Sequence, residues 1–203
     1  MVINIYVLNS LPKLISLCFK SKKLEHTLQQ YNTAFNKCHE VFKKKTVDYG
    51  TSWRVFRIKS ITDQLYIKAK RIRTIDEKGQ QKIGDSIESE FMACVNYGVM
   101  GLIQLSIDDA EPTELPAEKA DELYAKQRKA ITDLMIAKNH DYGEAWRDMR
   151  ISSFTDMILT KLHRVKQIEE NDGKTLISEG IEGHYSDIVN YALFALIKIE
   201  EAK

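Results

Sequence analysis

The sequence predicts an all-α protein with an internal duplication, and two observations lead to this fold class. The phrase from Lys138 to Arg147 recurs 93 positions earlier, from Lys45 to Arg54, and glycine and proline supply only 9 and 3 of the 203 residues. Scarce glycine and proline favour long helices over many short strands and turns. A recurrence of this length indicates that one unit has been duplicated. We therefore expect two three-helix units, packed as a pseudo-two-fold helical bundle.

The duplication extends well beyond the phrase. At an offset of 93, residues 45–73 match residues 138–166 at 13 of 29 positions, and after one inserted residue the match resumes at the Asn-Tyr pairs that begin at Asn96 and Asn190. Chance does not give that density of matches. We therefore divide the chain into an N-terminal tail over residues 1–23, a first helical repeat over 24–105, a linker over 106–116 and a second helical repeat over 117–203.

Three helices are predicted in the first repeat. Apolar residues recur at three- and four-residue steps from Leu24 to Phe42, which indicates one apolar face on a helix. Gly50 should end this helix, because glycine accepts the left-handed conformation at a helix C-terminus at little cost. A second helix begins near Ser60, whose hydroxyl can cap free amides. A third, over about 86–105, is apolar almost all round and is therefore expected at the centre.

The second repeat follows the same plan. The stretch before it, Ser106 to Pro116, is acidic and holds two of the three prolines, as expected for a linker. Helices are predicted over about 117–138, 153–170 and 182–202. Because each unit can bury only one face on its own, the two should pack on each other.

Charge and cysteine content indicate which cellular compartment and which classes of binding partner to expect. The formal net charge is +1, so no global basic field indicates nucleic acid or a membrane as a partner. The three cysteines form no Cys-x-x-Cys pair, which fits a reducing cytoplasm better than a disulfide framework. The N-terminal tail is apolar-rich up to Phe19 but too short and too interrupted for a membrane span. We interpret it as an extra, weakly attached segment, and an anchor or export role is the alternative. Further assembly into a homodimer is left open.

The sharpest chemical signal is an acidic run at the start of the last predicted helix. On a helix, Glu179, Glu182, Asp187 and Asn190 fall within an arc of roughly 140°. Carboxylates on an otherwise buried helix carry a large desolvation penalty unless a cation or a base compensates for it. Hard oxygen ligands grouped in this way suit Mg²⁺, so we predict that Glu179, Glu182 and Asp187 bind the metal, with Glu182 and Asp187 catalytic. The alternative is an exposed helix with an acidic first turn.

Two basic residues on each second helix are predicted to bind phosphate. Lys161 and Arg164 lie three residues apart and therefore share a helix face, and Lys68 and Arg71 are their counterparts in the first repeat. Arginine binds a phosphate with a bidentate fork, and lysine neutralises it as a point charge. The alternatives are a solvated basic helix end, or one structural salt bridge that is present in both copies.

The repeated phrase offers candidate contacts for a base or a sugar. Asp141, Tyr142 and Trp146 follow one another closely in it, and Asn190 on the acidic helix is a further candidate for substrate binding. A base could stack on a tryptophan, but a tryptophan after a helix turn is more often buried in the core. Because the Asp-Tyr-Gly turn is intact in both copies, we interpret it first as a structural hinge that orients three helices.

Taken together, these motifs resemble a known family. Lys-x-x-Asp-Tyr-Gly, then Lys-x-x-Arg on the next helix, then Glu-x-x-Glu-x(4)-Asp-x-x-Asn-Tyr on the last resembles the nucleotide modification associated domain family, whose activity is unknown. The resemblance covers about residues 24–200, in a duplicated form. It implies a nucleotide as ligand or substrate.

The helical layout with grouped carboxylates is more distantly similar to all-α nucleotide pyrophosphohydrolases of the MazG and dimeric dUTPase type. Those enzymes bind Mg²⁺ through Glu-x-x-Glu and Glu-x-x-Asp motifs on two successive helices, whereas the acidic residues here fall in one run. This second resemblance implies Mg²⁺-dependent hydrolysis of a nucleoside triphosphate between its α and β phosphates. Lys161 and Arg164 would then stabilise charge on the phosphates.

The first copy departs from the motif in its acidic run. Ala93 stands where Asp187 stands, and Asp85 replaces Glu179. We therefore expect any metal site in the second repeat, with the first repeat as scaffold, or else a composite site that Lys68 and Arg71 reach from the first repeat. The rival function is a non-catalytic helical module that binds a nucleotide or a partner protein. For such a module, Asp187→Ala would mainly change stability.

Overall fold

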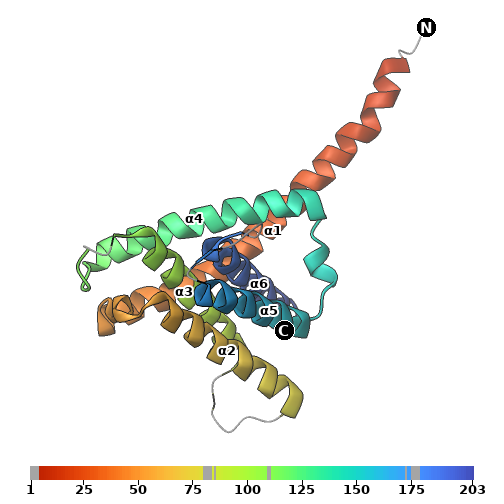
Figure 1. The fold of residues 1–203 in the computed structure, drawn as a ribbon. Coiled ribbons are helices and arrows are strands. Elements are labelled where there is room, and N and C mark those ends of the chain that lie inside the picture. The colour runs from red at the N-terminus through yellow and green to blue at the C-terminus, as the bar shows by residue number, and fades with distance from the viewer. Residues whose placement is uncertain (1–4, 80–83, 85, 109–110, 172, 175–178) are drawn as a thin grey trace.

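Six α-helices and two short 3₁₀ helices make up the described part of the chain (Figure 1). The computed structural model describes residues 5–79, 84, 86–108, 111–171, 173–174 and 179–203, with side chains from residue 23 onward. In chain order the elements are α1 (Ile5–Tyr49), η1 (Ser52–Val55), α2 (Ile58–Lys78), α3 (Ile87–Ser106), α4 (Ala117–Tyr142), η2 (Ala145–Asp148), α5 (Ile151–Glu170) and α6 (Ile181–Glu201). The described residues contain no strand, and the order α1-η1-α2-α3 recurs as α4-η2-α5-α6. The predicted all-α fold with a duplicated three-helix unit is confirmed.

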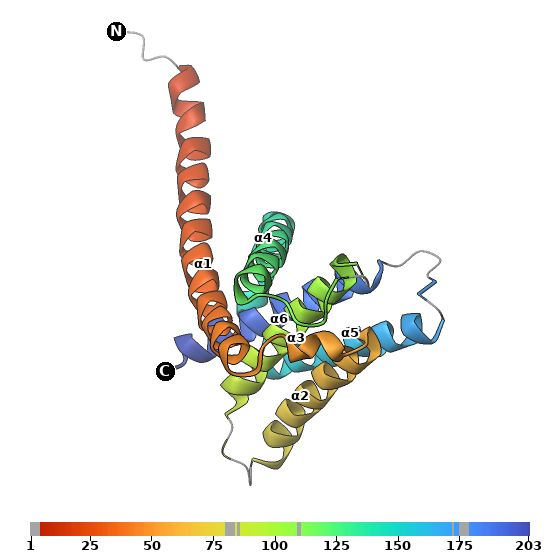
Figure 2. The same ribbon diagram turned by 90° about the vertical axis from the view of Figure 1, so that its left-hand side faces the viewer.

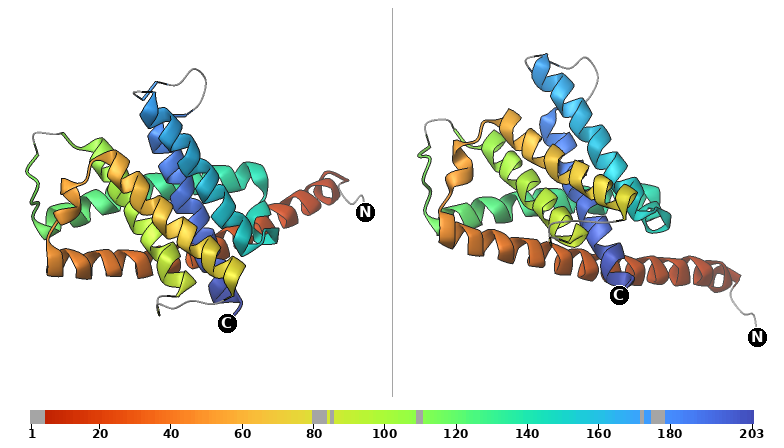
Figure 3. Two further views of the ribbon diagram at one scale, coloured as in Figure 1. Left: turned by 60° about the horizontal axis from the view of Figure 1, so that its bottom comes forward. Right: turned by 90° about the horizontal axis from the view of Figure 1, so that it is seen from below.

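The centre of the fold consists of α2, α3, α5 and α6. α3 packs against α6, and each is also in contact with the second helix of its own repeat, while α2 packs against α5 (Figure 3). α1 and α4 lie outside this group, and each contacts both α3 and α6. α1 continues past the bundle toward the N-terminus (Figure 2).

Equivalent hydrogen bonds link the two repeats. Tyr31 on α1 donates to Asn190 Oδ1 on α6 at 2.6 Å, and Tyr124 on α4 donates to Asn96 Oδ1 on α3 at 2.8 Å. Tyr124 is the counterpart of Tyr31, and Asn96 is the counterpart of Asn190. The first helix of each repeat therefore binds the third helix of the other, as expected at the isologous interface of a two-fold dimer.

A pair of salt bridges repeats the same relation between α2 and α5. Arg73 Nη2 lies 2.6 Å from Asp156 Oδ1, and Lys166 Nζ lies 2.6 Å from Asp63 Oδ1. Lysine and arginine occupy equivalent positions, as do the two aspartates. All four side chains are about a third exposed or more, so the pairs add little free energy but mark the pseudo-two-fold relation clearly.

Two glycines allow the central helices α3 and α6 to approach closely. A Cβ on Gly98 would clash with the side chain of Val189, and a Cβ on Gly101 would clash with the ring of Tyr185. Both partners are fully buried. The absence of a side chain at these two positions therefore brings the backbones together at the pseudo-two-fold interface.

Each Asp-Tyr-Gly turn ends a long helix, as predicted. Gly50 and Gly143 adopt left-handed φ values of 60° and 61°, in which a side chain would be strained. The 3₁₀ helix that follows buries its tryptophan, and Trp53 and Trp146 are 7 % and 6 % exposed. Both tryptophans are therefore core residues, in agreement with the core alternative.

The arginine after each tryptophan binds the turn to other parts of the fold. Arg54 donates from Nη1 to Gln104 Oε1 at 2.7 Å. Arg147 donates from Nη2 to Thr27 Oγ1 at 2.7 Å and to Gln30 Oε1 at 2.8 Å, both on α1. These contacts support the interpretation of the repeated phrase as a structural hinge.

Two helix starts differ from the prediction. α2 begins at Ile58 with Arg57 at its N-cap position and no side-chain cap, so Ser60 lies inside the helix. Helix α1 begins at Ile5, so the predicted tail is helical from that residue. No glycine or proline lies between Pro12 and Gly50, and nothing in that stretch breaks the helix. Within the described residues, we find no helix with the length and hydropathy that a membrane crossing requires.

Candidate functional site

Asp187 lies at the centre of a basic cluster in the second repeat. Its side chain is 4 % exposed and accepts from two lysines. Lys161 Nζ on α5 lies 2.7 Å from Oδ2, and Lys138 Nζ, from the last turns of α4, binds Oδ1. A buried carboxylate needs such compensation, and here lysines supply it. We call Lys138, Lys161, Arg164, His184 and Asp187 the second-repeat cluster.

The second-repeat cluster holds two ammonium groups and one guanidinium around a single buried carboxylate, and the charge of Glu179 also acts on His184. Two ammonium groups share one carboxylate, and the Arg164 guanidinium lies one turn beyond Lys161 on α5. The side chains of Lys138 and Lys161 remain 40 % and 27 % exposed. Asp187 therefore holds the two ammonium groups in place while leaving part of each accessible to an anion.

His184 lies one turn before Asp187 on α6 and is 7 % exposed. Neither of its ring nitrogens has a hydrogen-bond partner among the described residues. Burial lowers its pKa most, and the neighbouring charges of Lys161 and Arg164 lower that pKa further, against the opposite influence of Glu179 and Asp187. The imidazole is therefore neutral at pH 7, with one nitrogen able to donate and the other able to accept.

We expect His184 to make the fold less stable as the pH falls below about 6.5, the ordinary histidine pKa. Because its folded-state pKa is lowered, the unfolded chain binds a proton at a pH where the folded chain does not, and the free energy of unfolding then decreases with decreasing pH. Urea unfolding at about pH 7.5 and about pH 5.5 measures this decrease. His184→Gln should show a smaller decrease, but not none, since burial also lowers the pKa of His39. Equal decreases in the two proteins would contradict the prediction.

The first repeat contains an equivalent ion cluster that the sequence did not reveal. Glu90 on α3 is 2 % exposed, with Lys68 Nζ 3.2 Å from Oε2 and Arg71 Nη1 2.5 Å from Oε1. Glu90 occupies the position of His184, one helical turn before Ala93. The first copy therefore has a buried carboxylate one helical turn before Ala93, a position that the comparison of Ala93 with Asp187 did not consider. The available signal was the three-residue spacing, which places Glu90 on the face of Ala93.

Lys68 and Arg71 thus bind a residue of their own repeat. This arrangement favours one cluster in each repeat over the composite site considered from the sequence. Of the predicted phosphate-binding residues, Lys161 contacts Asp187 directly, and the charges of Lys161 and Arg164 both lower the pKa of His184. Lys161, which was predicted to bind phosphate, thus forms a direct ion pair with Asp187, which was predicted to bind the metal.

The carboxylates predicted to bind Mg²⁺ do not gather in this structure. Glu179 and Glu182 are exposed, whereas Asp187 is buried and both its oxygens are bound by lysines. No group of three or more His, Cys, Asp or Glu side chains in the described part of the chain is placed to hold a metal ion. The residues as placed therefore do not fit a Mg²⁺ site. Asp85, the first-repeat counterpart of Glu179, lies outside the described residues.

The remaining predicted residues make contacts of different kinds. Asn190 is 4 % exposed and accepts from Tyr31, so it is part of the interface between the repeats. Trp146 stacks on Phe194 with ring centroids 4.3 Å apart. Tyr142 is 73 % exposed, and Asp141 is exposed beside His140. Only Tyr142 and Asp141 among these are open to a ligand.

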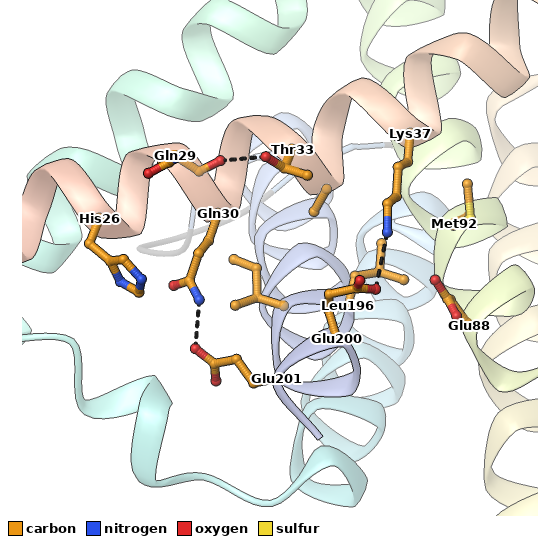
Figure 4. A pocket seen from close by; sticks show the side chains of 12 residues that line it. His26, Gln29, Gln30, Thr33, Lys37, Glu88, Met92, Leu196, Glu200 and Glu201 are labelled. Atoms are coloured by element: carbon orange, nitrogen blue, oxygen red, sulfur yellow. Dashed lines mark hydrogen bonds and ion pairs between the residues drawn. The ribbon is translucent and has the colours of Figure 1, made fainter. Parts of the chain in front are cut away.

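A hollow of about 400 Å³ lies between α1, α3 and the end of α6 (Figure 4). Its polar side chains bind one another, with Lys37 Nζ 3.0 Å from Glu200 Oε2 and Gln30 Nε2 2.7 Å from Glu201 Oε1. None of the predicted site residues lines it. We therefore interpret it as a polar junction between helices.

Comparison with known proteins identifies the family. No curated protein and no solved structure matches this chain. The family model described as nucleotide modification associated domain 1 matches twice, over residues 45–105 and residues 138–199. The two matches contain the two Asp-Tyr-Gly turns and both ion clusters, and together they cover more than half of the sequence. The chain therefore belongs to the nucleotide modification associated domain 1 family, of which it carries two copies.

Proposed function

We propose that this protein binds a nucleotide and that a phosphate group of the nucleotide contacts the second-repeat cluster. The family description connects the domain with nucleotide modification, which supports a nucleotide as the ligand. The observation that carries the proposal is the difference between Glu90 and His184. At the same position on equivalent helices, the first repeat has a carboxylate bound by cations, and the second has an imidazole whose nitrogens lack partners.

The first repeat supplies its own anion between Lys68 and Arg71. In the second repeat the equivalent position offers a neutral donor, so an anionic oxygen from outside can take the place that the Glu90 carboxylate has in the first. A phosphate suits this position because it accepts several hydrogen bonds and carries the charge that Lys161 and Arg164 attract. Its negative charge would also raise the pKa of His184.

Asp187 has a positioning role in this proposal. It fixes the ammonium groups of Lys138 and Lys161 through its two oxygens, and it cancels only part of their charge. We limit the proposed function to binding. The predicted pyrophosphohydrolase chemistry depends on a metal ion, and no three His, Cys, Asp or Glu side chains among the described residues are placed to hold one. The non-catalytic nucleotide-binding module is thus the function that the geometry supports best.

We expect Lys161→Gln to weaken nucleotide binding about ten-fold or more, because it removes a charged contact to phosphate. Isothermal titration with nucleoside mono- and triphosphates, with and without Mg²⁺, gives the dissociation constants. Lys68→Gln is the matched control: it changes the equivalent lysine, which binds the internal Glu90, and should leave affinity unchanged. The imidazole NMR signals of His184 should shift on binding, and His184→Gln identifies them.

Two results would contradict the proposal. One is that no nucleotide tested gives a heat of binding or shifts the imidazole NMR signals of His184. The other is equal loss of affinity in Lys161→Gln and Lys68→Gln, which would indicate that each lysine acts through the fold. Pyrophosphate release by the wild-type protein, lost in Asp187→Asn, would instead favour the hydrolase.

A further inference from the structure

A pocket of about 480 Å³ lies in the first repeat, between the end of α1, η1 and α3. Every residue that lines it comes from the first repeat. Its volume is in the range of small-molecule sites, and most of its lining is apolar with a few polar groups, as in such sites. The first Asp-Tyr-Gly turn forms one end, with Tyr49 and Gly50 in the lining.

Two residues that line the first-repeat pocket have different counterparts in the second repeat. There, Asp187 stands in place of Ala93 and binds Lys138, the counterpart of Lys45. Lys45, by contrast, has no hydrogen-bond or ion-pair partner among the described residues, although it lines the pocket. The first repeat has thus lost a carboxylate at the pocket and kept the cation that the carboxylate would bind.

A second substitution enlarges the same space. Phe194 in the second repeat stacks on Trp146 with ring centroids 4.3 Å apart, whereas Met100 occupies its position in the first repeat and lines the pocket. Trp53 lines the pocket too. Methionine is flexible and contacts aromatic rings favourably, so it suits a wall that must fit a planar ligand.

We propose that the first-repeat pocket binds an aromatic ligand with one anionic group, of about the size of a nucleoside monophosphate. The Lys45 ammonium binds the anion, and the ring lies against the apolar and aromatic lining of Trp53, Phe56 and Met100. Ser52 places a hydroxyl group along the same pocket that can donate to or accept from a sugar or a ring substituent, and the Ser89 hydroxyl, which donates to the Ser86 carbonyl, can accept there. No residue of the second-repeat cluster takes part, so this site does not depend on the function proposed above.

The first test compares Lys45→Gln with Lys44→Gln. Lys44 has the same charge and is exposed, but it does not line the pocket. The probes are nucleoside 5′-monophosphates, the corresponding nucleosides, phenyl phosphate and indole-3-acetate, with binding followed by titration calorimetry and by NMR shifts of the methionine methyl groups. We expect Lys45→Gln to lower the affinity for the anionic probes about ten-fold and the affinity for the neutral nucleosides much less. Lys44→Gln should match the wild type.

A second test restores the residue of the other repeat. Ala93→Asp places a carboxylate where Asp187 stands, so Lys45 can bind it as Lys138 binds Asp187. Anionic probes should then bind about ten-fold more weakly, while thermal unfolding shows whether the variant is folded. Ala93→Leu fills the pocket without adding a charge, so it should lower the affinity for neutral and anionic probes alike. It serves as the second variant if Ala93→Asp does not fold.

The probes also distinguish the source of the ligand. Binding of the monophosphates but not of phenyl phosphate or indole-3-acetate assigns the pocket to nucleotides, and equal binding assigns it to aromatic anions in general. Absence of binding by all probes overturns the proposal. Binding that Lys161→Gln abolishes and Lys45→Gln leaves intact also overturns it, because such binding belongs to the second-repeat cluster.

Discussion

Replacement of both Lys138 and Lys161 with methionine will lower the free energy of unfolding by about 3–5 kcal/mol. The Asp187 side chain is 4 % exposed, and these two ammonium groups are its ion-pair partners among the described residues. Methionine keeps an apolar stem of similar length, so the main change is the loss of charge. A buried carboxylate without a cation retains its full desolvation cost, which accounts for the size of the effect.

Each single variant should lower the free energy of unfolding by much less than half of the decrease in the double variant, since one lysine still binds Asp187. Urea unfolding of the wild type, both single variants and the double variant measures this coupling. A control removes the whole ion cluster: adding Asp187→Leu to the double variant should recover most of the stability, because an apolar group of similar volume has no charge to compensate. Additive single effects, or no recovery with Asp187→Leu, would mean that the lysines stabilise the fold by packing alone.

The fold was predictable because the duplication supplies an internal alignment. The repeated turn at Gly50 and Gly143 marks the same helix end twice, and the counterpart of each α2 residue from Ile58 to Glu77 can be read on α5. The same alignment pairs Arg73 with Lys166 and Asp156 with Asp63, the residues of the two equivalent salt bridges. Helix starts were harder, because the cap at Arg57 uses no side chain and therefore leaves no sequence signal.

The candidate site was only partly predictable, because charge compensation is a property of packing between helices. The acidic run drew attention to Asp187, yet the compensation of its charge by two lysines depends on how α4 and α5 meet α6. Periodicity alone could not decide between a metal ion and ammonium groups as the compensating cation. Likewise Glu90, one turn before Ala93, binds Lys68, the counterpart of Lys161, but its second partner is Arg71 and not the counterpart of Lys138.

Trp146→Ala should lower the free energy of unfolding by about 3–5 kcal/mol, the cost of a large cavity in a packed core. Trp146 is 6 % exposed, its ring stacks on Phe194 at 4.3 Å, and the Arg147 guanidinium lies 4.3 Å from the ring centroid. A role in binding a base predicts the opposite pattern, with little change in stability and weaker nucleotide binding. Urea unfolding and nucleotide titration of the same variant separate the two.

Two further variants make the interpretation specific. Tyr142→Ala alters a 73 % exposed aromatic residue four positions away and should change stability by no more than about 0.5 kcal/mol. Trp146→Phe keeps a ring against Phe194 and removes an indole N–H that has no partner among the described residues, so its cost should be well below that of alanine. If Trp146→Phe were as destabilising as Trp146→Ala, the indole nitrogen would have a partner that matters, and the tryptophan would be more than a core residue.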